Sequence, residues 1–158
     1  MAIGYNTIIP TTEGYKTAEE IKVGDMVFGL DNKLLKVTQT NTVIEAKMYK
    51  LVFVNDFERI EIVTNILQEF PMPISIKDSF IDYNSYKPVS CDYYKVNDVV
   101  KGGNRDFVLI DKIAIDNQPL RNIYLEDSSN IFKVLDNNNK NANWINYNEY
   151  NFPSIFVY

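Results

Sequence analysis

Cys91, Asp25 and Asp98 are the residues of this sequence whose types suggest chemistry. A thiol attacks a carbonyl once a neighbouring base or cation favours its thiolate form. Two carboxyl groups held close together can divide the roles of general acid and general base. The hydroxyl of Thr64 could polarise a carbonyl by donating a hydrogen bond. The 158 residues include no histidine, so any such reaction would lack the side chain that most often transfers protons near neutral pH.

Each candidate also has a structural explanation, which we favour. No histidine is available to activate Cys91, so a buried structural cysteine is the simpler interpretation. Asp25 and Asp98 fall at equivalent places of an internal repeat, which predicts two matching roles, either in a turn or at the entry to a strand. Thr64 lies in a strand-like stretch where backbone groups would satisfy its hydroxyl. The sequence "KGGNR" (101–105) resembles a phosphate-binding glycine loop, but no helical pattern follows it, so we expect a hairpin turn.

The composition narrows the function classes. The chain is 46% hydrophobic and 23% charged, which is typical of a folded globular protein. A net charge of -5 without any run of Lys or Arg argues against nucleic-acid binding. With one cysteine and no histidine, we expect no disulfide within the chain, no metal site and no cofactor.

The apolar stretches of the sequence predict where the protein is located, and its residue usage predicts the type of genome that encodes it. No stretch has the roughly 18 apolar residues that a membrane span needs, and no secretory signal is visible. We therefore expect that the chain is made in a cytoplasm and does not associate with a membrane. Asn, Ile, Lys, Tyr and Phe are frequent, and all five have AT-rich codons. This usage points to an AT-rich genome such as that of a virus.

The elements that would position these residues are mostly β-strands. Short β-branched or alternating stretches are separated by turn residues, which predicts an all-β fold. A single capped turn at "TAEEI" is the only helical signal. The proline-containing "PMP" (71–73) predicts an irregular or edge segment. The expected strands are "DMVFGL", "LLKVTQTNTVI", "MYKLVFV", "ERIEIVTNI", "FVLIDKIAI", "NIYL" and "IFKVL".

An internal repeat organises these strands. "IKVGDMV" (21–27) recurs as "YKVNDVV" (94–100), and each copy is followed by a turn, a long apolar strand, a second turn and another strand. Two similar β-subunits facing each other would bury one shared core. The repeat therefore predicts a twofold duplication within a single domain, which we place at residues 1–136.

The C-terminal tail, residues 137–158, differs from the rest of the chain. It begins with the connector-like "NNNKNAN" and then carries many aromatic residues, which disordered tails seldom do. Either the tail folds back over its own domain, or it docks on another protein through aromatic anchors. The candidate interaction residues are Trp144, Tyr147, Tyr150, Phe152, Phe156 and Tyr158.

Three stretches resemble motifs of the Hint family, which comprises the hedgehog and intein domains. "GYNTIIPTTEGYKTAEEIKVGDMVFGLDNK" is similar to the N-terminal motif. "MYKLVFVNDFERIEIVTNILQEF" is similar to the second motif, which ends in Thr-x-x-His. "RNIYLEDSSNIFKVL" is similar to the late motif before the C-terminal splice junction. The resemblance covers residues 2–136 and implies a horseshoe of two pseudo-twofold related β-subdomains, followed here by the aromatic-rich tail.

The resemblance also implies where the family's reactive groups should lie. The attacking Cys or Ser corresponds to Ala2, which has no lone pair for the first step. The family's Thr-x-x-His retains Thr64, but Leu67 replaces the histidine that aids the acyl shift. Asn130 stands at the place of the histidine in the late motif. An engineered Cys-to-Ala change would explain only Ala2.

The C-terminal reaction of the family requires a histidine and asparagine pair. The resemblance places this pair near Lys140 and Asn141, where Asn141 retains the group that could cyclise. No competent proton donor stands beside it in the sequence. The degenerate positions are therefore Ala2, Thr64, Leu67, Asn130, Lys140 and Asn141.

The resemblance thus implies the fold and, through these replacements, argues against the family's activity. We expect a catalytically inactive Hint-like domain, not an enzyme, that binds other proteins within a larger assembly or homo-oligomer. Hint-like domains also occur among phage virion proteins, so a tail, baseplate, neck or capsid-associated component is the specific hypothesis. The alternative is a remnant self-processing domain that cleaves near Asn141 or Asn143.

Overall fold

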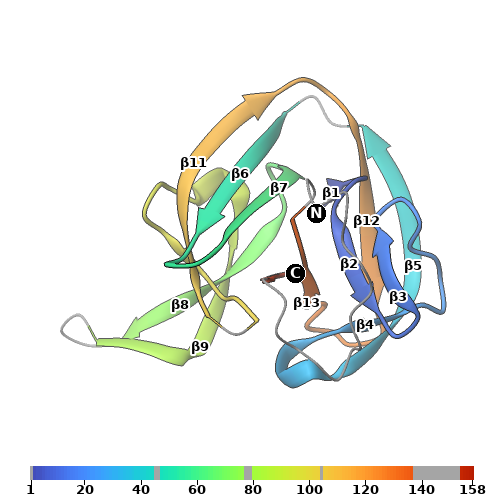
Figure 1. The fold of residues 1–158 in the computed structure, drawn as a ribbon, viewed down its shortest axis with the longest axis horizontal. Coiled ribbons are helices and arrows are strands. Elements are labelled where there is room, and N and C mark those ends of the chain that lie inside the picture. Colours follow the sequence, from blue (N-terminus) through green and yellow to red (C-terminus); the bar gives the residue numbers. More distant parts are fainter. Residues whose placement is uncertain (1, 45–46, 77–79, 104, 137–153) are drawn as a thin grey trace.

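The computed structural model describes residues 2–44, 47–76, 80–103, 105–136 and 154–158, with side chains described outside residues 74–85. Its strands form two lobes that face each other like the arms of a horseshoe, with both chain ends between them (Figure 1). This confirms the predicted all-β architecture. The strands are β1 (Ile3–Gly4), β2 (Ile8–Thr11), β3 (Gly14–Thr17), β4 (Met26–Phe28), β5 (Leu34–Ile44), β6 (Met48–Val54), β7 (Arg59–Asn65), β8 (Glu69–Ile76), β9 (Phe80–Ser90), β10 (Val99–Val100), β11 (Phe107–Ile115), β12 (Pro119–Leu125), β13 (Phe132–Val134) and β14 (Ile155–Val157).

The strongest sequence patterns became the long strands. β5, β6 and β11 coincide with the expected stretches residue for residue. The expected turn "KGGNR" joins β10 to β11 in an antiparallel pair. Strands β2, β3 and β9 were not expected from the sequence, because their mixed polar and apolar residues show no clear alternation. Strand β8 carries two prolines and pairs only with β9, with a register shift after Pro73, which agrees with the predicted irregular edge segment.

The two copies of the repeat exchange strands. Among the described residues, one ten-stranded sheet has the order β10-β11-β6-β7-β1-β12-β5-β4-β2-β3. Strand β5 of the first copy pairs with β12 of the second, and β11 of the second copy pairs with β6 of the first. Each copy therefore contributes strands to both lobes, which explains why one copy alone could not complete a core.

Matching hydrogen bonds show the duplication at atomic detail. The Asp25 carboxylate accepts from the backbone N–H of Lys22 at 3.0 Å, and the Asp98 carboxylate accepts from the N–H of Lys95 at 2.8 Å. The backbone N–H of Asp25 also donates to the Lys22 carbonyl at 3.1 Å, and that of Asp98 donates to the Lys95 carbonyl at 2.9 Å. The predicted pair of matching roles is confirmed as a pair of turns, which explains the equivalent aspartates.

The residue before each aspartate has the left-handed conformation that the turn requires. Gly24 has a φ of 96° and Asn97 a φ of 80°; these are residue types that tolerate positive φ. The N–H of Gly24 donates to the carbonyl of Val37 at 2.9 Å, and the N–H of Asn97 donates to that of Leu109 at 2.8 Å. The same turn thus leads into the long strand of each copy.

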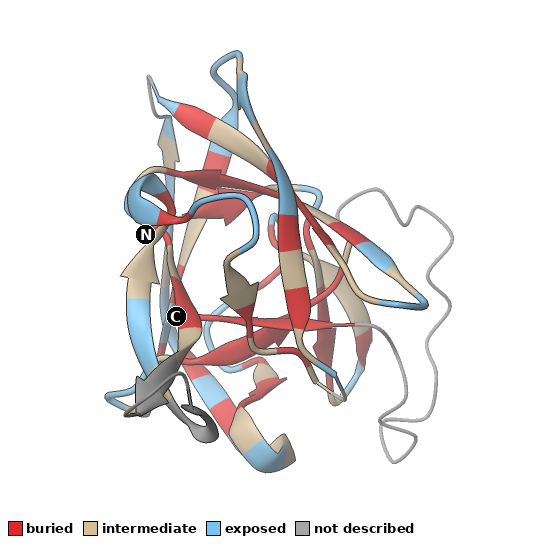
Figure 2. Cartoon of the chain, turned by 90° about the vertical axis from the view of Figure 1, so that its left-hand side faces the viewer, coloured by how far each residue is buried: buried red, intermediate tan, exposed pale blue. Residues whose placement is uncertain are grey.

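One core joins the two lobes. Figure 2 shows buried residues along the middle of the molecule and exposed residues at strand ends and turns. Within this core, Phe53 of β6, Phe70 of β8 and Tyr94 pack ring against ring, with centroids 5.4 to 6.5 Å apart. Because Tyr94 opens the second repeat while Phe53 belongs to the first, this aromatic cluster connects the copies.

The described end of the tail belongs to the same core. Strand β14 pairs antiparallel with β13, where Phe156 faces Lys133 in register, and its three residues are buried. For residues 154–158 the chain therefore folds back on its own domain. Residues 137–153, the first part of the tail, lie outside the described residues.

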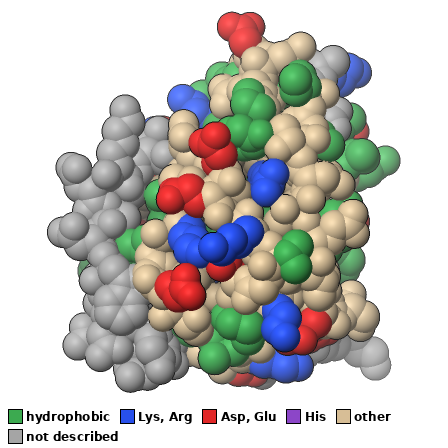
Figure 3. Space-filling view, turned by 90° about the vertical axis from the view of Figure 1, so that its right-hand side faces the viewer, with side chains coloured by type: hydrophobic (Ala, Val, Ile, Leu, Met, Phe, Trp, Pro, Cys, Tyr) green, Lys and Arg blue, Asp and Glu red, His purple; other side chains and the backbone are tan. Residues whose placement is uncertain are grey.

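Charges on the lobe that carries β5 are mixed in sign. In Figure 3, basic side chains on this face are flanked by acidic ones, with hydrophobic side chains scattered between them. On β3, for example, Lys16 contacts Asp25 at 2.9 Å and Glu13 at 3.4 Å. In the described part of the chain, no helix is long and apolar enough to cross a membrane.

Candidate functional site

Ala2, the residue that the motif resemblance assigns to the attacking position, has a buried methyl group. Ala2 is 1% exposed and packs in a small apolar cluster with Met48, Val63 and Leu120. Its backbone N–H donates to Asn65 Oδ1 at 3.2 Å, and the N–H of Asn65 donates to the Ala2 carbonyl at the same distance. The N–H and the carbonyl of Ala2 thus both bind Asn65, at the end of β7.

Strand β1 brings this end of the chain into the centre of the sheet. Ile3 lies in register with Thr64 of β7 on one side and with Arg121 of β12 on the other. Since β7 and β12 belong to different lobes, the two residues of β1 join them. The residues that the resemblance assigns to one site, Ala2 and Thr64, are therefore neighbours in the structure.

Thr64 and Cys91 are both fully buried. The expectation that backbone groups bind the Thr64 hydroxyl was wrong, because this hydroxyl has no conventional hydrogen-bond partner among the described residues. Burial raises the pKa of the Cys91 thiol, an effect that a weak interaction with the Thr64 hydroxyl opposes. A buried thiol whose pKa is raised does not supply a thiolate nucleophile near neutral pH, which agrees with the structural role predicted for Cys91.

Leu67 and Gln68 occupy the turn after β7. Leu67, at the place of the family's histidine, is 59% exposed, whereas Gln68 is 2% exposed. The Gln68 amide Nε2 donates to the main-chain oxygens of Glu69 and Tyr158, both at 2.9 Å. The sequence pattern did not single out Asn65 and Gln68 as site residues; the available signal was that Asn65 lies within the Thr-x-x-Leu segment and Gln68 directly after it.

Asn130, which the motif resemblance assigns to the second family histidine, binds main-chain groups of the neighbouring turn. Its Oδ1 accepts from the backbone N–H of Leu125 at 2.7 Å, and its Nδ2 donates to the Ile123 carbonyl at 3.3 Å. Its φ of 53° is one that asparagine tolerates better than most residues. Asn130 thus closes the turn that leads from β12 into β13.

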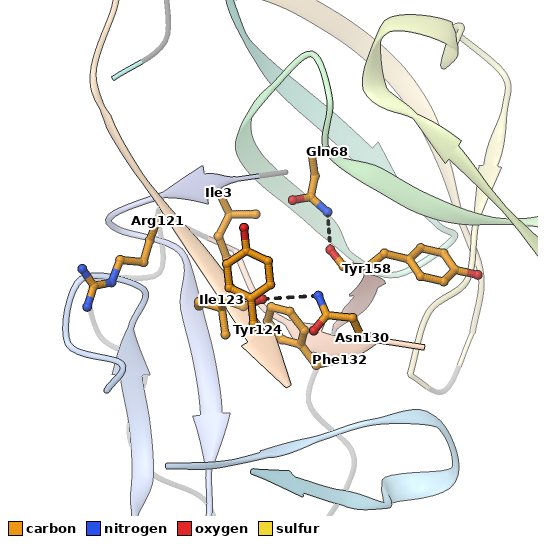
Figure 4. A pocket seen from close by; sticks show the side chains of 8 residues that line it. All are labelled: Ile3, Gln68, Arg121, Ile123, Tyr124, Asn130, Phe132 and Tyr158. Atoms are coloured by element: carbon orange, nitrogen blue, oxygen red, sulfur yellow. Dashed lines mark hydrogen bonds between the residues drawn. The ribbon is translucent and has the colours of Figure 1, made fainter. Parts of the chain in front are cut away.

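A small pocket lies between these groups, shown in Figure 4. Its volume of about 10 Å³ is roughly the space that one water molecule requires. The side chains of Gln68 and Asn130 approach it from opposite sides, and the Tyr158 main chain lies between them (Figure 4). The lining residues are Ile3, Gln68, Arg121, Ile123, Tyr124, Asn130, Phe132 and Tyr158.

The last residue brings the C-terminal segment to this pocket. The N–H of Tyr158 donates to the Glu69 carbonyl at 3.1 Å, and its main-chain oxygen accepts from Gln68. Burial, and then the nearby Glu69 carboxylate, raise the pKa of its phenol. The expected junction residues Lys140 and Asn141 lie outside the described residues. Among the described residues of the tail, the one that lines the pocket is Tyr158, directly after β14.

The candidate interaction residues divide into two groups. Phe156 is 2% exposed and Tyr158 is half-buried, so Phe156 contributes to the core of this chain and offers little surface to a partner. The other candidates, Trp144, Tyr147, Tyr150 and Phe152, lie outside the described residues. Their role as contact residues stays a prediction.

The assembled site positions main-chain groups but offers little chemistry. Asn65 binds the main chain of Ala2 and Gln68 binds that of Tyr158, whereas Asn130 binds the turn after β12, all through neutral hydrogen bonds. The described residues contain no group of three or more Cys, Asp or Glu that could bind a metal ion. This arrangement fixes the chain without an evident nucleophile or proton shuttle.

Comparison with known proteins supports the fold alone. No protein-family model and no curated protein matches the sequence. The MchDnaB-1 intein is 14% identical, with a TM-score of 0.67 over 85% of this chain and 95% of that one. The gp41-1 intein is 17% identical, with a TM-score of 0.66 over 83% and 91%. A bacterial intein-like domain from Clostridium thermocellum is 20% identical, with a TM-score of 0.63 over 86% and 94%.

Proposed function

We propose that this chain, which has the Hint fold of inteins, performs no self-splicing or self-cleavage and acts as a structural and protein-interaction module. The observation that carries the proposal is the burial of Ala2 at the place of the attacking residue. Its methyl group packs against apolar neighbours, and its backbone is held by Asn65. A site built around a methyl group is adapted to packing and cannot start an acyl transfer.

The surrounding positions support the same proposal. Leu67 is exposed and cannot transfer a proton, and Asn130 uses its amide to close a turn. The only thiol, Cys91, is buried and its pKa is raised. Since acyl shifts of this kind require proton transfer to the leaving group, the replacements together remove more than the first step.

The absence of self-cleavage is tested by intact-mass measurement of the chain with a tag at each end. We expect only full-length protein after prolonged incubation, with or without added thiol. A fragment ending near residue 141 would instead establish self-processing, and replacing Asn141 and Asn143 by alanine would identify the cleaving residue.

A second variant tests whether the chain lacks only the nucleophile or also the groups that transfer protons. Ala2→Cys restores a nucleophile, and we expect this variant to remain intact as well, because no histidine is present to assist it. Thermal unfolding of the variant would confirm that it folds. Thiol-induced cleavage of Ala2→Cys would show that the rest of the machinery is functional, and the proposal would then fail.

We further propose that the module acts through its aromatic tail, within a homo-oligomer or a larger assembly such as a phage virion. The tail's aromatic content and the AT-rich residue usage support this hypothesis. Replacing Trp144, Tyr147, Tyr150 and Phe152 by serine should reduce the oligomeric mass measured by light scattering while leaving the melting temperature unchanged. An equal loss of stability would show that these residues serve the core instead.

The virion hypothesis has its own test. Mass spectrometry of purified virus particles from the source should detect the intact chain of 18.3 kDa in stoichiometric amounts. If the chain is absent from the particles, the virion hypothesis fails and a cytoplasmic location is the remaining hypothesis.

A further inference from the structure

A second cavity lies on the far side of the β13 and β14 pair from the main core. Its volume is about 150 Å³, compared with about 10 Å³ for the pocket between Gln68 and Asn130. It lies between this strand pair, the 3-10 turn Leu30–Asn32 and the segment after β10. The lining residues are Asp31, Asn32, Lys101, Gly103, Lys133 and Phe156, none of which lines the pocket between Gln68 and Asn130.

Strand alternation explains why a lysine is buried here. Phe132 and Val134 of β13 point into the main core, together with Ile155 and Val157 of β14. Successive side chains of a strand point to opposite faces, so Lys133 and its partner in register, Phe156, share the other face. Both line the cavity, and both are 2% exposed.

Two ammonium groups meet in this cavity. Lys133 Nζ donates to Asn32 Oδ1 at 2.5 Å and lies 5.7 Å from the centre of the Phe156 ring. Lys101 Nζ donates to the Tyr86 hydroxyl at 3.0 Å and lies 6.0 Å from the centre of the same ring. Burial, and then the positive charge of Lys101, lower the pKa of Lys133. An anion placed between the two lysines would offset both effects.

A buried hydroxyl lies beside the two lysines. Ser154 is 1% exposed, and its Oγ has no hydrogen-bond partner among the described residues. A methyl group added to Gly103 would lie 2.3 Å from Ser154 Oγ and 3.6 Å from Lys133 Nζ, so both atoms are close to one point above Gly103. A buried hydroxyl without a partner is costly, and a ligand oxygen there would accept its hydrogen bond.

We propose that this cavity binds a small oxyanion of the phosphate class. The two lysines and Asn32 line a space that accommodates a tetrahedral ion, the Ser154 hydroxyl lies next to the lining residue Gly103, and charge-assisted hydrogen bonds favour such a ligand. One group opposes it, because the exposed carboxylate of Asp31 lies at the rim. This site is independent of the proposed function, since it shares no residue with the region around Ala2.

The test is titration of the full-length chain with inorganic phosphate at constant ionic strength, followed by calorimetry. We expect saturable binding that weakens about tenfold or more in Lys101→Gln and in Lys133→Met, because each removes a charge-assisted hydrogen bond. Asp31→Asn should strengthen binding about two- to fivefold by removing the opposing charge. Asparagine also tolerates the φ of 54° at this position, so the fold should be preserved.

Control variants and ligands make the result decisive. Lys47→Gln, at an exposed lysine outside the cavity, should leave binding unchanged. If Lys133→Met fails to fold, phosphate binding can still be measured with Lys101→Gln and Asp31→Asn, which change a half-buried and an exposed residue. Absence of saturable binding up to about 10 mM phosphate would overturn the proposal. Equal weakening in Lys47→Gln, or tighter binding of acetate than of phosphate, would also overturn it.

Discussion

Deletion of residues 154–158 is expected to unfold the domain, or to leave it only marginally stable. The deletion removes β14, whose residues Ile155, Phe156 and Val157 are at most 2% exposed. Burial of three apolar side chains stabilises a fold by about 5–9 kcal/mol, whereas the whole domain is expected to have about 5–15 kcal/mol. The cut would also expose Phe132 and Val134 of β13. Circular dichroism and thermal unfolding of the 1–153 chain would measure the loss.

Point variants keep this prediction testable if the truncated chain aggregates. Ile155→Ala should cost about 2–4 kcal/mol because it leaves a cavity in the core. Ile44→Ala should cost less than about 0.5 kcal/mol, since this isoleucine is 75% exposed and surface changes are usually small. If the 1–153 chain kept the melting temperature of the full-length protein, β14 would contribute nothing to the core and the fold-back pairing would be refuted.

Phe53→Ala is expected to destabilise the domain by about 3–5 kcal/mol, the usual range for a large aromatic residue removed from a core. Phe53 is fully buried, and its ring packs at 5.6 Å from Phe70 and 6.5 Å from Tyr94. Because this aromatic cluster connects the two copies of the repeat, the cavity would lie where the lobes are joined. Chemical denaturation monitored by far-ultraviolet circular dichroism would measure the change.

Phe57 is the matched control for this variant. It is 71% exposed, and its ring contacts Arg105, whose guanidinium carbon lies 4.5 Å from the ring centre. Phe57→Ala should therefore cost at most about 1 kcal/mol, the value of an exposed cation–π contact. Equal losses in the two variants would show that the core does not depend on the aromatic cluster.

Much of the architecture was predictable from local patterns. Strands β5, β6 and β11 were predicted residue for residue, since alternation within a stretch is a local property. The repeated "K-V-x-D" segment predicted two equivalent roles, and the hydrogen bonds of Asp25 and Asp98 showed that both are turns. Strand β9 was missed because it is stabilised mainly by pairing with β8, and pairing leaves only a weak local signal.

The site was predictable only in its residue types. The resemblance of the motifs named Ala2 and Thr64 as candidate positions, and the register of Ile3 with Thr64 shows that they are neighbours. Asn65 and Gln68 were missed, because an amide side chain acquires its role from distant partners. The hydrogen bond from Gln68 to Tyr158, for example, spans 90 positions in the chain.

The sequence by itself determined the strand-forming stretches, the duplication and the absence of histidine, because alternation, repetition and composition are properties of the residues alone. The tertiary structure decided which strands exchange between the copies, where the tail's last residues pack and which charges meet in one cavity. Lys133 and Asn32 are 101 positions apart. Contacts at this separation depend on the packing of the whole core, which no local pattern encodes.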